Sequence, residues 1–330
     1  QVTVERGEGC YVWDNQGNKY LEGLAGLWCT ALGYGNQEVI ATATEQMNKL
    51  TFSHMFGGKT HQVAIDLADK LADMIPMKDA VISFGNSGSD ANDTHIKLLR
   101  YYHEAIGKPH CRKIIARERS YHGVTVAAAS LTGLPVTQNH FDLPVDALGI
   151  LRTDHPHYYR GKQGEETEDE FVDRIVSNLE SMILREGPDT IAAFIAEPIT
   201  GASGVIVPPE GYYQKVQAVL NRYDIMFWAD EVITGFGRTG SDFGCNTMGI
   251  ESPDMMTFAK QLSSAYMPIS ASAINRDMYT AMIEQTATAG AFGHGYTYSG
   301  HPVACAVALK VLEIYQRDEI FQKAAVTGQY

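Results

Sequence analysis

A lysine, two carboxylates, an aromatic–histidine pair and a turn of small residues each follow a short apolar segment of the sequence. These groups are Lys260, Asp230, Glu197, Tyr121-His122-Gly123 and Gly85-Asn86-Ser87-Gly88-Ser89-Asp90. In an open parallel sheet, ligands bind beyond the carboxyl ends of the strands. A charge at one strand end is usually a solvated loop residue. Five such groups at one edge predict a shared site.

The small-residue turn, GNSGSDAND (85–93), could bind an anion. Backbone N–H groups and hydroxyls at a strand-to-helix junction can point at one anion, helped by the start of the helix. An ordinary N-cap made by Ser89 or Asp90 explains the turn equally well. The turn lacks the GK[ST] ending of a nucleotide-binding P-loop, so a single phosphate fits better than a triphosphate.

Lys260 lies in TFAKQLSS, directly after an apolar segment and without an acidic neighbour in sequence. It could simply reach solvent at the strand end. Alternatively, burial lowers its pKa and frees the amine to form a Schiff base. An aldehyde cofactor with one phosphate is pyridoxal phosphate (PLP), which also needs a carboxylate to keep its ring nitrogen protonated. Asp230 can serve, because a charge about 4 Å away contributes about 4 kcal/mol at an effective dielectric of 20.

These residues require a frame of buried strands. Runs of consecutive apolar residues suit strands of a parallel sheet that are covered on both faces, and they occur at 80–84, 113–116, 191–196, 225–229 and 254–259. Helical periodicity covers 36–50 and 61–74, and a helix to about Leu184 should follow the acidic stretch 164–170. The start alternates and turns at Asn15–Asn18, which predicts a hairpin. The fold class is therefore α/β, with a mostly parallel central sheet and helices on both faces.

Composition limits the possible functions. The 330 residues carry 26 Lys and Arg against 39 Asp and Glu, a net charge of −13, which argues against a nucleic-acid surface. No apolar run approaches 18 residues, so no membrane span is expected. The five cysteines are scattered without a CxxC pair and suit the reducing cytoplasm. We expect a soluble cytoplasmic enzyme.

Six segments occur in order along the chain: NSGSDAND, SYHG, AEPI, DEVITGFGRTG, TFAKQLSS and YTYSGHP. Together they closely resemble the class-III PLP-dependent aminotransferases of fold type I. The resemblance runs from about Tyr11 to Ala308. It is strongest for the branch that moves amino groups between ω-amino acids or amines and pyruvate.

The resemblance implies a role for each motif residue. Lys260 would carry the Schiff base, Asp230 would pair with the ring nitrogen, and Val232 and Tyr121 would cover the two ring faces. The other cofactor-binding residues would be Ser87, Gly88 and Ser89 at the phosphate, His122 and Gly123 beside Tyr121, and Glu197 on the substrate side. Thr297 would reach the phosphate in the partner subunit of a homodimer. Trp28, Phe56 and Tyr121 would line the amine pocket.

The chain also departs from the family pattern. Family members usually have glycine after the lysine and often again later in that loop, where this chain has Gln261, Ala265 and Ser270. Relatives typically continue about a hundred residues further, so most of a small C-terminal domain and its carboxylate-binding arginine are expected to lie outside this chain. The expected domains are 1–40 with the small domain, 41–305 as the PLP-binding domain, and 306–330 as the start of the C-terminal domain.

The implied reaction is ping-pong transfer of an amino group from an ω-amino acid or amine to a keto acid such as pyruvate. A different PLP enzyme of the same fold, an aminomutase or decarboxylase, and an inactive assembly module are the alternatives. Gly235–Gly240 spells GxGxxG, but it does not follow a strand directly, so a dinucleotide site is not favoured. His155 and His157 lack the ligand spacing of a metal site.

Overall fold

Seven strands form the central sheet of the computed structural model, which describes residues 1–330 except the side chain of Ala289. The strands are β4 (Val81–Gly85), β5 (Lys113–Arg117), β6 (Ile150–Thr153), β7 (Ile191–Ala196), β8 (Met226–Asp230), β9 (Met255–Phe258) and β10 (Ser270–Ile274). Their order across the sheet is β4-β10-β9-β8-β7-β5-β6. Strand β10 runs antiparallel to both of its neighbours, and the other pairs are parallel. The strands other than β10 therefore end at the same edge.

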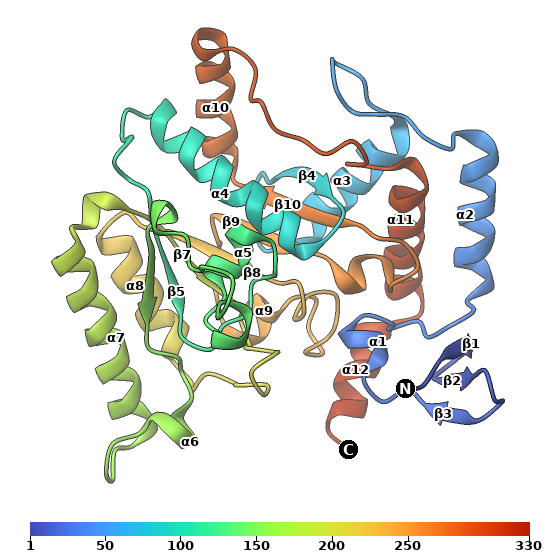
Figure 1. The fold of residues 1–330 in the computed structure, drawn as a ribbon, viewed down its shortest axis with the longest axis horizontal. Coiled ribbons are helices and arrows are strands. Elements are labelled where there is room, and N and C mark those ends of the chain that lie inside the picture. The colour runs from blue at the N-terminus through green and yellow to red at the C-terminus, as the bar shows by residue number, and fades with distance from the viewer.

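Helices cover both faces of this sheet (Figure 1). The principal helices are α2 (Gln37–Lys49), α3 (Gln62–Met74), α4 (Gly88–Ala105), α7 (Glu168–Glu186), α8 (Tyr212–Arg222), α10 (Arg276–Ala289) and α11 (Pro302–Arg317). Shorter ones are α1 (Ala25–Trp28), α5 (Val126–Leu131), α6 (Tyr158–Gly161), α9 (Gly244–Met248) and α12 (Ile320–Gly328). None of the described helices is long and apolar enough to cross a membrane.

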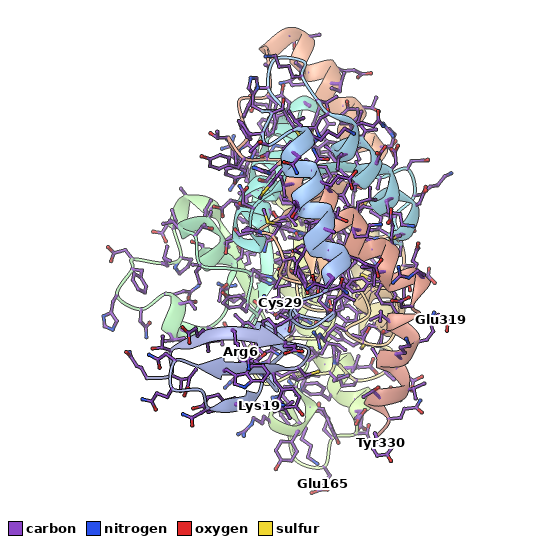
Figure 2. All side chains as sticks on the ribbon, turned by 90° about the vertical axis from the view of Figure 1, so that its right-hand side faces the viewer. Arg6, Lys19, Cys29, Glu165, Glu319 and Tyr330 are labelled. Carbon is purple, nitrogen blue, oxygen red and sulfur yellow. The ribbon has the colours of Figure 1, made fainter. Side chains whose placement is uncertain are left out.

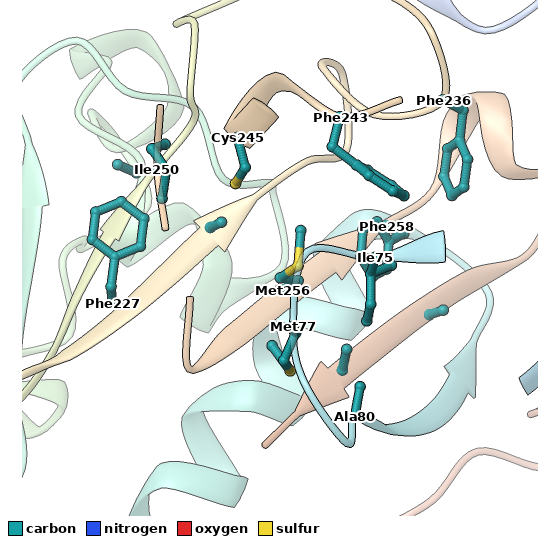
Figure 3. Packing of buried hydrophobic residues seen from close by; sticks show 14 of the residues in the cluster. Ile75, Met77, Ala80, Phe227, Phe236, Phe243, Cys245, Ile250, Met256 and Phe258 are labelled. Carbon is teal, nitrogen blue, oxygen red and sulfur yellow. The ribbon is translucent and has the colours of Figure 1, made fainter. Parts of the chain in front are cut away.

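Alternation along the strands divides the core into two layers, because successive side chains point to opposite faces. Phe227 and Met256 belong to the cluster that packs under α3, α7, α8 and α11. Trp228 and Met255, their neighbours in sequence, belong to the cluster under α4 and α10. Figure 3 shows the first layer, where the rings of Phe236, Phe243 and Phe258 gather with centroids 5.4–5.7 Å apart.

A second, three-stranded antiparallel sheet begins the chain, with β1 (Val4–Glu8), β2 (Tyr11–Asp14) and β3 (Lys19–Leu21). Figure 2 shows Arg6 and Lys19 on this sheet, with Cys29 nearby. The expected hairpin is confirmed, since β2 pairs with β3 across the turn at 15–18.

The α/β fold class is confirmed, and the expected strands and helices are present within a few residues. Strands β6 and β10 were not predicted from the sequence. The boundary expected at 305/306 falls inside the continuous helix α11.

His95 on α4 is a buried histidine with an unusual environment. Its ring stacks on Trp228, with centroids 5.0 Å apart, and neither ring nitrogen has a hydrogen-bond partner among the described residues. Burial lowers the pKa of His95 from 6.5 to about 3. The folded protein therefore keeps this ring neutral where the unfolded chain would protonate it.

This difference predicts a pH dependence of stability. The folded-state pKa of His95 is depressed, so its contribution is complete above pH 6.5 and is lost as pH falls toward 3. Between pH 6 and pH 5 the free energy of unfolding should fall by about 1.2 kcal/mol more in the wild type than in His95→Leu. Urea denaturation of both proteins at the two pH values measures this, and equal decreases would contradict it.

Candidate active site

The strand ends meet in one cavity of about 440 Å³ at the carboxyl edge of the sheet. It is lined by the predicted residues Ser87, Gly88, Ser89, Tyr121, His122, Gly123, Glu197, Asp230, Val232 and Lys260, together with others that include Asn92 and Cys29. The site is thus assembled from β4, β5, β7, β8 and β9, as parallel-sheet topology requires.

The turn after β4 ends in a capping box at the start of α4. The Ser87 hydroxyl accepts from the backbone N–H of Asp90, and the Asp90 carboxylate accepts from those of Asn86 and Ser87. Helix geometry leaves the N–H groups of Gly88 and Ser89 without intrahelical acceptors. Capping and anion binding are therefore compatible, because the cap uses Ser87 and Asp90 and leaves the N–H groups of Gly88 and Ser89 available to an anion.

Glycine is required at two positions beside this turn. A Cβ on Gly88 would lie 2.9 Å from Val232, and one on Gly123, whose φ is +124°, would lie 2.5 Å from the Ser89 hydroxyl. These contacts bring three chain segments close around the helix start. Val232 lies in a turn beyond β8 and lines the cavity.

Asp230 is a buried carboxylate, 3% exposed, at the end of β8. Its Oδ2 accepts from Asn92 Nδ2 at 3.0 Å and lies 2.8 Å from His122 Nδ1, and its Oδ1 accepts from the Val232 N–H at 3.1 Å. Burial raises the pKa of Asp230, but the hydrogen bonds and charge from His122 outweigh it, so the net pKa is lowered. The carboxylate is ionised at neutral pH.

Lys260 follows β9 and begins η4 (Lys260–Ser263), a 3₁₀ turn. It lines the cavity, and its amine forms neither a hydrogen bond nor an ion pair with the described residues. Burial lowers the pKa of Lys260, while Asp230 opposes this effect. A partly desolvated amine in the same cavity as an ionised carboxylate is suited to nucleophilic attack and proton transfer.

Glu197 lies directly beyond β7, buried to 2% exposure. Its Oε1 accepts from the Tyr121 N–H and its Oε2 from the Gly201 N–H, each at 2.9 Å. Burial raises the pKa of Glu197. Below it, the buried Arg117 donates to the Glu197 carbonyl oxygen at 2.6 Å and to Thr200 Oγ1 at 3.1 Å, which fixes this segment.

Three predicted residues lie elsewhere in the single chain. Phe56 lines a separate cavity of about 460 Å³ with Tyr296 and Met282, so one chain does not bring Phe56 and Tyr121 together. Trp28 is half-buried next to Leu27 and Cys29, which line the active-site cavity while Trp28 does not. Thr297 is exposed on the loop between α10 and α11, outside both cavities.

Asn92, Arg117 and Thr257 were missed by the sequence analysis. All three are buried polar residues whose hydrogen bonds reach the site residues or their neighbours. The sequence offered one indication of such a buried polar residue: Thr257 is polar within the otherwise apolar strand MMTF.

The family model for class-III aminotransferases matches residues 1–330. The chain belongs to the class-III aminotransferases. Among curated members, it is 51% identical to gamma aminobutyrate transaminase 3, chloroplastic, from Solanum lycopersicum, over 98% of this chain and 62% of that protein. It is also 51% identical to probable gamma-aminobutyrate transaminase 2, mitochondrial, from Oryza sativa subsp. indica, over 97% of this chain and 64% of that protein. The chain therefore spans less than two thirds of these relatives' length.

Solved structures of the family superpose on this class-III aminotransferase along the whole chain. The omega transaminase from Pseudomonas jessenii in complex with PMP superposes with a TM-score of 0.98 at 51% identity, covering 100% of this chain and 72% of that one. A transaminase with L-ala superposes with a TM-score of 0.97 at 49% identity, covering 100% and 77%. The expected family and fold type are confirmed.

Proposed function

We propose that this class-III aminotransferase binds PLP and transfers an amino group from an ω-amino acid or amine to a keto acid such as pyruvate. The observation that carries the proposal is the pairing of a desolvated Lys260 with an ionised, buried Asp230 in one cavity beside a helix start. These groups fit the aldehyde, ring nitrogen and phosphate of PLP.

The residues of the cavity divide the work of binding. The N–H groups and hydroxyls of Ser87, Gly88 and Ser89 would hold the phosphate, and Asp230 would hold the ring nitrogen. Tyr121 and Val232 would cover the ring, with His122 and Gly123 beside Tyr121 and Glu197 on the substrate side. When bound, PLP supplies an aldehyde that exchanges amines and a ring that withdraws electrons from the substrate carbon.

Lys260 has two tasks in this proposal. Its Nζ would hold the cofactor's aldehyde, and its free amine would take a proton from the substrate carbon and return it, as general base and then as acid. The lowered pKa suits both tasks, because more of the amine is neutral near pH 7. Asp230 stays ionised throughout, since His122 and Asn92 donate to it.

The donor class rests on the relatives and on the residues around the cavity. The two plant relatives carry the names gamma aminobutyrate transaminase and probable gamma-aminobutyrate transaminase, and the Pseudomonas jessenii relative is an omega transaminase. One solved relative is a tryptophan-to-glycine variant of a thermostable omega transaminase engineered for the synthesis of bulky amines. Trp28, in the segment that borders the cavity, is our candidate for limiting donor size.

A donor panel tests this function. The full-length protein, loaded with PLP, should convert γ-aminobutyrate or 1-phenylethylamine with pyruvate or 2-oxoglutarate as acceptor, and turnover should require the keto acid. Product formed without any keto acid would support an aminomutase or decarboxylase instead. A protein that binds PLP but turns over no donor would be the assembly module, and use of α-amino acids alone would contradict the ω-amine assignment.

We also propose a homodimer in which Thr297 of each chain completes the phosphate site of the other. The exposed position of Thr297, outside the cavity of its own chain, supports this arrangement. Sedimentation should show a dimer or larger assembly, and Thr297→Ala should weaken PLP binding. A fully active monomer would contradict the proposal.

We further propose a domain division at residues 40 and 305 and a cytoplasmic location. The names of the plant relatives place those proteins in chloroplasts or mitochondria.

A further inference from the structure

A chain of buried hydrogen bonds leads from Trp228 to Asp230 through two other side chains. The Trp228 Nε1–H donates to Thr257 Oγ1 at 2.8 Å, and the Thr257 hydroxyl donates to Asn92 Oδ1, also at 2.8 Å. Asn92 Nδ2 then donates to Asp230 Oδ2 at 3.0 Å and to the His122 carbonyl oxygen at 2.7 Å. Trp228 and Thr257 are fully buried, and Asn92 is 1% exposed.

The sheet register brings these groups together. Trp228 and Asp230 are two residues apart on β8, so their side chains share one face of the sheet. Thr257 on β9 is the register partner of Asp230. Helix α4 packs over this face and contributes Asn92 from its second turn. The contact is therefore set by the fold and not by a mobile loop.

The direction of each hydrogen bond follows from the chemistry of the groups. An indole N–H can only donate, so the Thr257 oxygen is the acceptor there and its own proton is free for Asn92. That proton fixes the Asn92 carbonyl oxygen toward Thr257. The NH₂ group of Asn92 must then face Asp230, because the opposite orientation of the amide would place its carbonyl oxygen against the Asp230 carboxylate.

The two carboxylate oxygens of Asp230 differ in the number of hydrogen-bond partners they have. Oδ2 has two side-chain partners, Asn92 Nδ2 and His122 Nδ1, whereas Oδ1 accepts only the Val232 N–H among the groups that the structure describes. His122 Nε2 has no partner among the described residues, so the ring contacts Asp230 through Nδ1. Oδ1 is the oxygen with accepting capacity to spare.

We propose that Trp228, Thr257 and Asn92 form a positioning relay that fixes the orientation of Asp230 and reserves its Oδ1 for the ring nitrogen of the cofactor. This inference rests on the proposed binding of PLP. Thr257 and Trp228 do not line the cavity, so they act through Asn92 alone.

The test compares the affinities of the full-length protein for PLP and for the analogue in which a C–H group replaces the ring nitrogen. Only PLP can use Asp230, so the ratio of the two dissociation constants measures that contact. Thr257→Val keeps the shape of the side chain but removes the hydroxyl. It should reduce the ratio about tenfold, the equivalent of one net hydrogen bond. Thr257→Ser should restore the ratio to within about twofold of wild type.

Two further variants separate the relay from general effects of substitution. Thr153→Val makes the same change at a buried strand threonine whose hydroxyl has no hydrogen bond among the described residues, and its ratio should stay at the wild-type value. If Thr257→Val fails to fold because the Trp228 N–H loses its acceptor, the double variant Trp228→Phe, Thr257→Val removes both groups and should show the same tenfold reduction.

The outcomes distinguish the relay from the proposed function. A wild-type protein that binds neither compound would overturn PLP binding and the relay with it. Normal binding of PLP with an unchanged ratio in the Thr257→Val protein, or in the double variant, would overturn the relay alone. An equal reduction in Thr153→Val would also overturn it.

Discussion

Replacing Lys260 with alanine should lower the rate of amino transfer by at least about a thousandfold, because one change removes both the covalent anchor and the proton carrier. Binding of PLP should persist through the start of α4 and the contacts of Asp230. Alanine has the backbone preferences of a non-glycine residue, as lysine does. The difference in rate between the wild type and the variant therefore measures the loss of the amine. Steady-state rates with the donors described above provide the measurement.

The covalent anchor can also be located directly. Borohydride reduction of the PLP-loaded wild type, followed by peptide mapping, should place the pyridoxyl group on Lys260, and the Lys260→Ala protein should remain unlabelled. Lys215→Ala is the control, because Lys215 forms an exposed ion pair with Asp173 on the protein surface. This variant should still be labelled on Lys260 and should transfer amino groups at the wild-type rate. A label on Lys97 or Lys113 would show that the anchor is misassigned.

Asp230→Asn should slow amino transfer by roughly a thousandfold while leaving the label on Lys260. A charge about 4 Å from the ring nitrogen contributes about 4 kcal/mol at an effective dielectric of 20, and asparagine lacks that charge. The lysine itself is unchanged, so the borohydride experiment separates the two variants.

A matched control is available next to Asp230. Glu231 is also fully buried, but its carboxylate binds Thr234 and the N–H groups of Gly244 and Cys245 and does not line the cavity. Glu231→Gln should cost stability and affect the rate of amino transfer far less. Equal loss of rate in the two variants would mean that burial of a carboxylate, and not its position at the ring nitrogen, is what matters.

The strand-end residues could be predicted because the parallel strands are apolar at consecutive positions. In IAAFIA, for example, all six residues are buried, and the next residue, Glu197, must lie at the sheet edge. Strand β10, SASAI, escaped this rule. Its serines are buried because they bond to α4: Ser270 donates to Asp90 Oδ1 at 3.0 Å and Ser272 to the Ala91 carbonyl oxygen at 3.4 Å.

Residues that act through tertiary contacts could not be found in this way. Asn92 is polar on a helix, where exposure is the usual expectation, and only the packing of α4 on the sheet buries it. Phe56 illustrates the opposite error, since its aromatic character suggested the amine pocket but its loop carries it to another cavity. Side-chain type indicates chemistry, whereas the folding of loops and helices decides which cavity receives it.

The backbone around the lysine has a consequence for the engineering of this protein. Lys260, Ser264 and Ala265 have φ values of +47°, +48° and +63°, the left-handed region that favours glycine. At position 260 no other residue can supply the amine, so selection for activity must tolerate the strain. At Ala265 no such demand is visible, and a directed-evolution search for thermostability should recover glycine there, with a gain of about 1 kcal/mol.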